Sequence, residues 1–184
     1  DARQKTVRQF IVDPIDGTRS FIEGSKDWAH SIAISENGIV TSAVIYLPMR
    51  NALYAATIGN GATLNDVPIR ANPDKPIDTA TVLSAKPNLD PKYWAATVPP
   101  FKRTFRSSLA YRMALVAEGR FDGMLTLRPT WEWDVAAGAL IVTEAGGAVS
   151  DQKGGPAVFN NPHPQINGIV AAGGIHTSLI TALA

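Results

Sequence analysis

The sequence predicts an α/β fold in which helices and β-sheets pack in layers. The first part of the chain alternates short β-rich runs with turn signals, the pattern of an antiparallel meander. The second part alternates helical and β-rich patterns. Between them, residues 71–78 are rich in Asn, Asp and Pro, so we expect a subdomain boundary there. With 184 residues, of which 45% are hydrophobic, the chain is long enough for a sizeable core.

The first subdomain, over residues 1–78, is expected to be an antiparallel sheet. The dipeptide Asn37-Gly38 is a strong signal for a two-residue hairpin, and residues 48–51 and 59–61 predict further reversals. The predicted strands cover residues 10–12, 31–35, 40–46 and 52–57.

The second subdomain, over residues 79–184, is expected to alternate helix and strand. Ser107 or Ser108 caps a helix that ends at Gly119. Further helices are predicted over residues 135–145 and 177–184, and the first of these is apolar on nearly all sides, so we expect it to be buried. The predicted strands cover residues 81–84, 121–127 and 168–172.

The composition excludes several classes of function. There are 17 basic and 16 acidic residues, so no overall field favours nucleic acid or an anionic membrane. The absence of cysteine excludes disulfides, thiolate catalysis and cysteine-ligated metals. No apolar run approaches the length that spans a membrane, and the first residues show no signal-peptide core. We therefore expect a cytoplasmic protein whose partner is a small molecule.

The segment Asp13-Pro14-Ile15-Asp16-Gly17-Thr18 places two carboxylates three residues apart, directly after an apolar strand. Proline fixes its own backbone and glycine permits a tight approach, so both acids can point the same way. Carboxylate oxygens without nearby His or Cys suit Mg²⁺ or Mn²⁺ rather than zinc. The segment therefore predicts a metal site.

A third acid, Asp134, stands at the predicted start of the apolar helix, within the segment of residues 131–138. Three acids could hold two cations. The simpler interpretations are that the first segment is an ordinary turn and that Asp134 only caps a helix. They become less favoured because both segments occur together and in this order.

The motifs Asp-Pro-Ile-Asp-Gly-Thr (13–18) and Trp-Asp-Val-Ala-Ala-Gly (133–138) resemble those of the inositol monophosphatase superfamily of Mg²⁺-dependent phosphatases. The similarity extends from about residue 8 to the C-terminus and includes residues 59–65, 115–119 and 143–147. The resemblance implies a layered α-β-α-β-α sandwich, of which this chain would lack the N-terminal helices. It also implies a homodimer.

The resemblance assigns roles to the acids. Asp13 would bridge two Mg²⁺ ions, the main-chain carbonyl of Ile15 would bind one of them, and Asp16 with Asp134 would hold the other. The resemblance implies two or three Mg²⁺ ions, with Mn²⁺ as a substitute. The ions would activate a water and neutralise charge on the phosphoryl group during in-line attack.

The phosphate would lie against the backbone amides of Gly17 and Thr18, and the Thr18 hydroxyl would help to orient the attacking water. Family members also carry an upstream Gly-Glu-Glu segment whose glutamate binds the first metal. Here Asp1 is the only acid before Asp13. We therefore expect an N-terminally shortened copy with an incomplete site for the water-activating ion.

The sequence leaves two classes of substrate open, inositol phosphates and nucleoside bisphosphates. Inositol-hydrolysing members carry a glutamate seven residues before the second-motif aspartate, where this chain has Leu127. The segment Arg128-Pro129-Thr130-Trp131-Glu132-Trp133-Asp134 looks more like that of the 3'(2'),5'-bisphosphate nucleotidases. Arginine suits bidentate contact with a second phosphate, and an aromatic face suits a base. The candidate substrate-binding residues are Arg106, Ser107, Ser108, Arg112, Arg128 and Trp131.

The sequence thus predicts a Mg²⁺-dependent phosphomonoester hydrolase with catalytic residues Asp13, Asp16, Thr18 and Asp134. The expected substrate is 3'-phosphoadenosine 5'-phosphate or inositol 1-phosphate. The alternative is a non-catalytic or weakly active phosphate-binding member, because the upstream glutamate ligand is absent from this chain.

Overall fold

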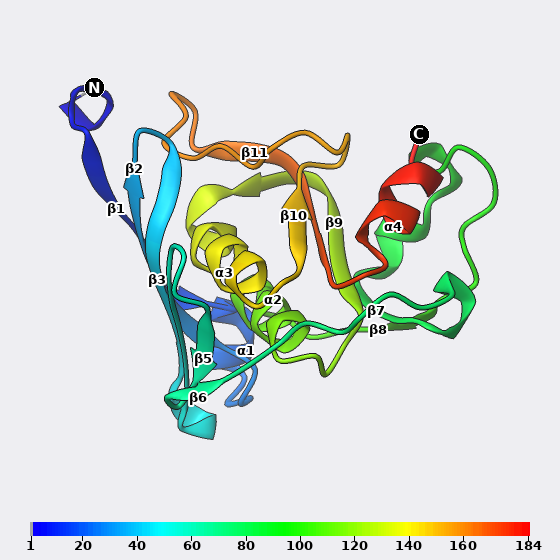
Figure 1. Ribbon diagram of the computed structural model, residues 1–184, viewed down its shortest axis with the longest axis horizontal. Coiled ribbons are helices and arrows are strands. Elements are labelled where there is room, and N and C mark those ends of the chain that lie inside the picture. The colour runs from blue at the N-terminus through cyan, green and yellow to red at the C-terminus, as the bar shows by residue number, and fades with distance from the viewer. Residues whose placement is uncertain (1) are drawn as a thin grey trace.

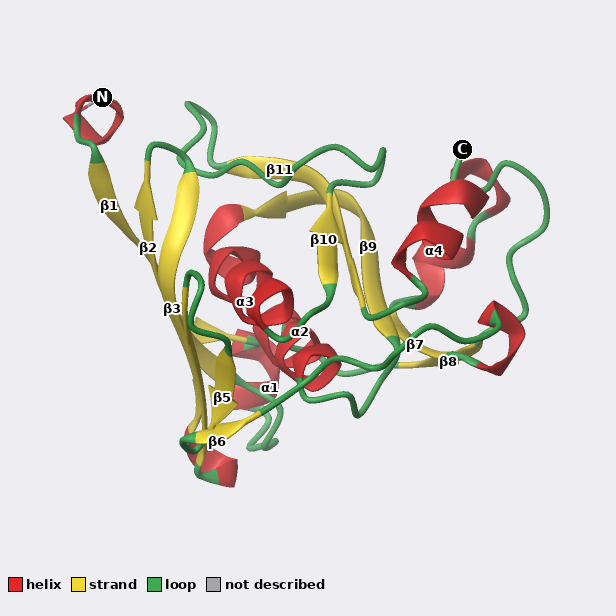
Figure 2. Ribbon diagram, viewed as in Figure 1, coloured by secondary structure: helices red, strands yellow, loops and turns green. Residues whose placement is uncertain are grey.

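The computed structural model describes residues 2–184 and confirms a layered α/β fold. Two β-sheets enclose two helices, and a further helix covers the far side of the second sheet (Figure 1). The same layers stand out when the chain is coloured by secondary structure (Figure 2). Asp1, the one acid that precedes Asp13 in the sequence, lies outside the described residues.

The first sheet is an antiparallel meander in which sequence order and spatial order coincide. The predicted strands over residues 31–35, 40–46 and 52–57 are confirmed, and the hairpin turns at Asn37 and Gly38, since Glu36 pairs with Ile39. The strands are β1 (Arg8–Asp16), β2 (Ala29–Glu36), β3 (Ile39–Leu47), β4 (Ala52–Thr57), β5 (Ala62–Leu64) and β6 (Val67–Pro68).

The second sheet is mixed and has the order β10-β11-β9-β7-β8. In it β7 runs parallel to β8 and β9, whereas β11 runs antiparallel to β9 and β10. Its strands are β7 (Thr81–Ser84), β8 (Lys102–Thr104), β9 (Gly123–Trp131), β10 (Ala148–Ser150) and β11 (Gln165–Ala172). The chain passes from the first sheet to the second between Pro68 and Thr81. We propose that the boundary between the two subdomains lies in this connection, at residue 78.

The α-helices are α1 (Thr18–Ile22), α2 (Leu109–Ala117), α3 (Glu132–Glu144) and α4 (His176–Ala182). The chain also forms short 3₁₀ turns between or before strands: η1 (Ala2–Lys5), η2 (Pro48–Arg50), η3 (Ile77–Thr79), η4 (Lys86–Leu89) and η5 (Pro91–Tyr93). Ser108 is the N-cap of α2, as one of the two predicted candidates, and its hydroxyl accepts a hydrogen bond from the Tyr111 N–H. In the described residues no helix is long and apolar enough to cross a membrane.

The main core lies where α2 and α3 fill the space between the sheets (Figure 1). Both sheets and both helices contribute fully buried side chains to this core: Ile45 from β3, Met113 from α2, Ile141 from α3 and Ile169 from β11. Helices α2 and α3 can approach closely because residue 138 is glycine. A Cβ at this position would lie only 2.6 Å from the Met113 side chain. The predicted burial of the second helix is therefore confirmed. A smaller core packs the other face of the second sheet against α4.

Several predicted boundaries were wrong, and those of one helix and one strand beside the acids matter most. Helix α3 begins at Glu132 rather than at residue 135. The buried Glu132 carboxylate accepts hydrogen bonds from the N–H groups of Asn160 and Asn161, and these bonds anchor the first turn. Strand β9 covers residues 123–131 rather than 121–127. It continues through Pro129 because the pairing with β11 is irregular there, and such a site tolerates proline.

The outer face of the first sheet, away from α2 and α3, exposes apolar side chains. Phe10 is 71% exposed and Ile32 is 39% exposed. Among residues 2–184 no helix covers this face (Figure 1). The described chain therefore forms four layers, in the order sheet, helices, sheet, helix.

Candidate metal centre

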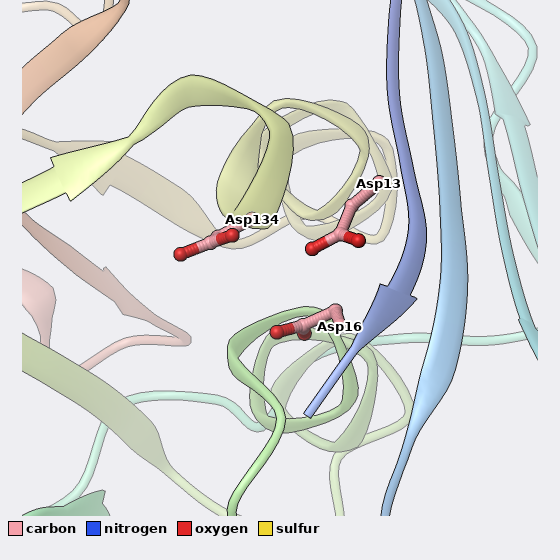
Figure 3. Close-up of side chains that lie close together, drawn as sticks. All are labelled: Asp13, Asp16 and Asp134. Atoms are coloured by element: carbon pink, nitrogen blue, oxygen red, sulfur yellow. The ribbon is translucent and has the colours of Figure 1, made fainter. Parts of the chain in front are cut away.

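Three acids from two distant parts of the chain meet at one end of the central helix layer. Asp13 and Asp16 belong to β1, and Asp134 belongs to the first turn of α3. Their carboxylates point toward one another (Figure 3), and one oxygen from each lies within 4.8 Å of the others. The three acids that the sequence suggested as metal ligands are therefore brought together.

A bulge in β1 explains why two acids three residues apart face the same way. Side chains alternate between the faces of a regular strand, which would send Asp13 and Asp16 to opposite sides. Asp13 pairs with Ser31 and Asp16 pairs with Ala29, so β1 holds one more residue than β2 over this interval. The extra residue restores a common direction. The Ile15 N–H donates to the Asp13 carboxylate at 2.9 Å and fixes that side chain.

The strand ends at Asp16 and is followed by Gly17, whose backbone is left-handed with a φ of 87°. A Cβ at this position would be strained and would lie 2.9 Å from the Asp27 carbonyl oxygen and 3.2 Å from the Cβ of Ser108. Glycine is therefore required for the turn into α1. Just beyond it, the Thr18 hydroxyl donates a hydrogen bond to the Ile15 carbonyl at 3.0 Å.

Asp16 is the most buried of the three acids, with 6% of its surface exposed. Its carboxylate accepts hydrogen bonds from the Ser108 hydroxyl at 2.5 Å and from the Ala110 N–H at 2.7 Å. Burial raises the pKa of Asp16 to about 6, because these two hydrogen bonds offset the loss of solvation only in part and the nearby Asp13 raises it further.

The pKa of Asp134 is raised further than that of Asp16. Burial raises the pKa of Asp134 to about 7, and the charges of Asp16 and Asp13 add to the effect. It is not a helix cap, since the N-cap of α3 is Trp131. Among residues 2–184, no Lys or Arg forms an ion pair with any of the three acids. The cluster therefore has an excess of negative charge that a divalent cation would neutralise, and its oxygens are the ligands that Mg²⁺ prefers.

A cleft of about 630 Å³ lies beside the acid cluster and is open to solvent. It is enclosed by the end of the first motif, the segment that leads into α2 and one face of β9. Of the residues suggested by the sequence, the cleft is lined by Gly17, Thr18, Arg106, Ser107, Arg112 and Arg128.

Two of the suggested substrate-binding residues lie elsewhere. Ser108 is fully buried and its hydroxyl bonds to Asp16. Trp131 stacks on Trp133 with ring centroids 4.7 Å apart, and it lies 5.5 Å from the ring of His163. It is not among the residues that line the cleft.

Leu127, the position of the expected glutamate, faces away from the cleft. It is 3% exposed and packs in the second core with Leu125. The neighbouring side chains of Thr126 and Arg128 point to the opposite face of β9 and line the cleft. A count of seven residues back from Asp134 therefore does not reach a side chain that lines the cleft.

Sequence reasoning missed Asp27 and Phe105, which also line the cleft. The Asp27 carbonyl accepts a hydrogen bond from the Ser107 hydroxyl at 3.0 Å, and its carboxylate forms an ion pair with Arg50 at 2.5 Å. These contacts join segments far apart in the sequence, and no local pattern signals them.

Comparison with known proteins identifies related chains. The model of the inositol monophosphatase family matches residues 2–184. The Nus factor SuhB of Escherichia coli K12 is 41% identical over 160 residues, which cover 80% of this chain and 58% of SuhB. The inositol-1-monophosphatase of Rhizobium meliloti is 36% identical over 157 residues, with 80% and 58% covered. This chain thus spans somewhat more than half the length of the curated relatives that it matches.

A solved structure agrees with the fold. The crystal structure of a Thermotoga maritima IMPase superposes with a TM-score of 0.82 at 31% identity and covers 96% of this chain and 68% of its own.

Proposed function

The chain belongs to the inositol monophosphatase family, and from this premise we propose that it acts as a Mg²⁺-dependent phosphomonoester hydrolase on a small phosphorylated metabolite. The observation that carries the proposal is the convergence of Asp13, Asp16 and Asp134 beside an open cleft. In the described residues these three acids form no ion pair with Lys or Arg, and two of them have raised pKa values, so their clustering is costly unless they bind a cation.

The metal would be held by the three acids together with the main-chain carbonyl of Ile15. We propose two or three Mg²⁺ ions, with Mn²⁺ as a substitute. When bound, such ions supply a water of lowered pKa and neutralise charge on the phosphoryl group. The protein keeps the ligands in place: the bulge in β1 aligns Asp13 with Asp16, and the Ser108 hydroxyl and Ala110 N–H hold the Asp16 carboxylate.

The phosphate would bind at the end of the first motif. Gly17 and Thr18 line the cleft where α1 begins, and their backbone amides would donate to the phosphate oxygens. The Thr18 hydroxyl donates its proton to the Ile15 carbonyl. Its oxygen then remains free to accept a hydrogen bond from the attacking water, which would orient that water.

The substrate that we propose is 3'-phosphoadenosine 5'-phosphate or inositol 1-phosphate. The arginines of the cleft support the first, and the name of the Rhizobium meliloti relative supports the second. The near-zero net charge supports a small metabolite as the partner rather than nucleic acid or a membrane. A homodimeric state and a cytoplasmic location are further proposals.

A second candidate is a regulatory member of the family with little or no turnover. The observation that favours it is that relatives 41% identical to this chain are called Nus factors. Both candidates keep the acid cluster, so they differ in turnover and not in fold.

A panel of phosphate-release assays separates the two candidates. Full-length protein is assayed with inositol 1-phosphate and with 3'-phosphoadenosine 5'-phosphate, in Mg²⁺ and in EDTA. We expect Mg²⁺-dependent release from one of them. An Asp13→Asn variant serves as the blank for contaminating phosphatase. Release that is equal in the wild type and the blank on every substrate would favour the regulatory candidate.

A further inference from the structure

The three acids reach the metal centre from two separate parts of the fold. Asp13 and Asp16 belong to the first sheet, whereas Asp134 belongs to the first turn of α3 (Figure 3). Mg²⁺ demands nearly ideal octahedral geometry, with metal–oxygen distances of about 2.1 Å, so it tolerates little error in the positions of its ligands. The distance between β1 and the start of α3 must therefore be fixed.

Several contacts hold the first turn of α3 to the second half of the chain. The Glu132 N–H donates to the Pro164 carbonyl at 3.0 Å. The Glu132 carboxylate accepts hydrogen bonds from the N–H groups of Asn160 and Asn161. None of these bonds reaches the first sheet, so they orient α3 without setting its distance from β1.

One buried hydroxyl connects this turn to the first sheet. The Ser31 hydroxyl, on β2, donates a hydrogen bond to the Trp133 carbonyl at 3.0 Å, across 102 residues of sequence. Among residues 2–184, it makes the one hydrogen bond that joins the backbone of the first turn of α3 to the first sheet. A carbonyl has two lone pairs, so that of Trp133 can accept the hydroxyl in addition to a bond within the helix. Because Trp133 directly precedes Asp134, the helix is anchored beside a proposed metal ligand.

Ser31 is also in register with the first acid motif. It is the partner of Asp13 in the pairing of β2 with β1, at the last regular position before the bulge. Directly paired residues of an antiparallel sheet project from the same face, with Cβ atoms about 5 Å apart. Ser31 is 1% exposed, and its strand packs against α3. One residue is thus paired with Asp13 and hydrogen-bonded to the neighbour of Asp134.

We propose that Ser31 is a positioning residue of the metal centre, whose hydroxyl sets the distance between Asp134 and Asp13 at which both carboxylates can bind one cation. The inference rests on the proposed function, which assigns the acids to a divalent cation. Ser31 acts through the backbone of Trp133 and contacts no substrate. Groups that orient a metal ligand typically change metal affinity by about ten- to a hundredfold when they are removed.

The same strand provides a matched control. Ser35 lies on the same face of β2 and is fully buried, as Ser31 is. Within the described part of the chain, the Ser35 hydroxyl has no hydrogen-bond partner. Ser35→Ala therefore removes the same atom from the same buried face without breaking a bond to α3. The difference between the two alanine variants reports the bond between Ser31 and Trp133.

The test measures Mn²⁺ binding to full-length protein without substrate, from the electron paramagnetic resonance signal of the free ion. Ser31→Ala is expected to weaken Mn²⁺ binding about tenfold, the lower end of the effect of an orienting group. Ser35→Ala should bind Mn²⁺ as the wild type does. Ser31→Thr keeps a hydroxyl that can donate to the same carbonyl, so it should restore the affinity.

Circular dichroism shows which variants fold. If Ser31→Ala does not fold, Ser31→Cys takes its place and should show the same loss of affinity, because a thiol fills the space but is a weak donor. If the added methyl group of Ser31→Thr is not accommodated, the comparison of the alanine variants at Ser31 and Ser35 decides.

Two results would overturn the proposal and leave the acid cluster and the proposed function intact. One is a Mn²⁺ affinity of Ser31→Ala equal to that of the wild type. The other is an equal loss in Ser31→Ala and Ser35→Ala, which would trace the effect to packing. Failure of the proposed function gives different results. A wild type that binds no Mn²⁺ would overturn both, whereas one that binds Mn²⁺ without releasing phosphate in Mg²⁺ would leave the role of Ser31 to be decided by the affinities alone.

Discussion

The Ser108 hydroxyl donates a hydrogen bond to the buried Asp16 carboxylate while it accepts one from the Tyr111 N–H. One side chain therefore caps α2 and positions a metal-ligand candidate 92 residues away in the sequence. This explains how the first turn of a helix in the second half of the chain fixes the acid motif of the first half. Stability and metal affinity should consequently be coupled at Ser108.

Ser108→Ala should lose both hydrogen bonds. We expect a cost of about 1 kcal/mol from the lost cap, which corresponds to a decrease of about 2–4 °C in Tm for a chain of this size. The further stabilisation by Mg²⁺ should also shrink, because Asp16 loses a donor that orients it. Thermal denaturation with and without Mg²⁺ measures both effects. Ser178→Ala, on the exposed face of α4, is the control. If Mg²⁺ raises the Tm of Ser108→Ala as much as that of the wild type, the coupling is disproved.

Substitution of the acids should affect turnover in a definite order. Asp13→Asn should abolish activity because that residue is proposed to contact two ions. Asp16→Asn and Asp134→Asn should each lower kcat by about a hundredfold or more, as loss of a key electrostatic group does. Steady-state phosphate release checks the order, with Asp66→Asn at an exposed turn as the control. Near-normal Mg²⁺-dependent turnover by Asp134→Asn would remove that residue from the ligand set.

Ca²⁺ should bind to the cluster without supporting turnover. It is larger than Mg²⁺, accepts more ligands and holds them at longer and more variable distances, so the alignment for in-line attack should be lost. We expect Ca²⁺ to raise Tm and to inhibit phosphate release in competition with Mg²⁺. Rates in Ca²⁺ that match those in Mg²⁺ would count against a site built for Mg²⁺.

The metal-free protein should lose stability as pH rises because of Asp134. Its folded pKa of about 7 lies above 3.8, the ordinary pKa of an aspartate, so between these values the folded state binds more protons than the unfolded state. The contribution of this group therefore favours folding below about pH 4 and is lost as pH rises toward 7. Asp134→Asn removes the titration, so in EDTA it should raise Tm at pH 7.5 relative to the wild type.

The same variant at pH 4 provides the internal control, because the wild-type acid is protonated there and the gain should vanish. Thermal denaturation in EDTA at both pH values measures the difference. A gain of equal size at pH 4 and pH 7.5 would show that the carboxyl group of Asp134 is not titrating in the folded protein.

Local patterns in the sequence predicted much of this fold. Alternation and turn residues located the central strands, and the cap at Ser108 located α2. The two acid motifs predicted which three carboxylates would meet, since Asp13, Asp16 and Asp134 converge as expected. These features depend on residues that are neighbours in sequence or on motifs whose order is fixed.

The rest depended on contacts that no local pattern encodes. The start of α3 at Glu132 follows from hydrogen bonds to Asn160 and Asn161, which lie in another loop. The two faces of β9 became distinguishable only in the structure: Thr126 and Arg128 line the cleft, whereas Leu127 packs in the second core. Short edge strands such as β8 and β10 have too few residues to show a period.

The central claim is that Asp13, Asp16 and Asp134 hold a divalent cation together. Anomalous diffraction from crystals grown with Mn²⁺ tests it most directly, because the signal locates the ion without reference to activity. We predict an anomalous peak in contact with carboxylate oxygens of all three residues. Well-ordered crystals at saturating Mn²⁺ with no peak at the three acids, or with the ion bound elsewhere, would contradict it.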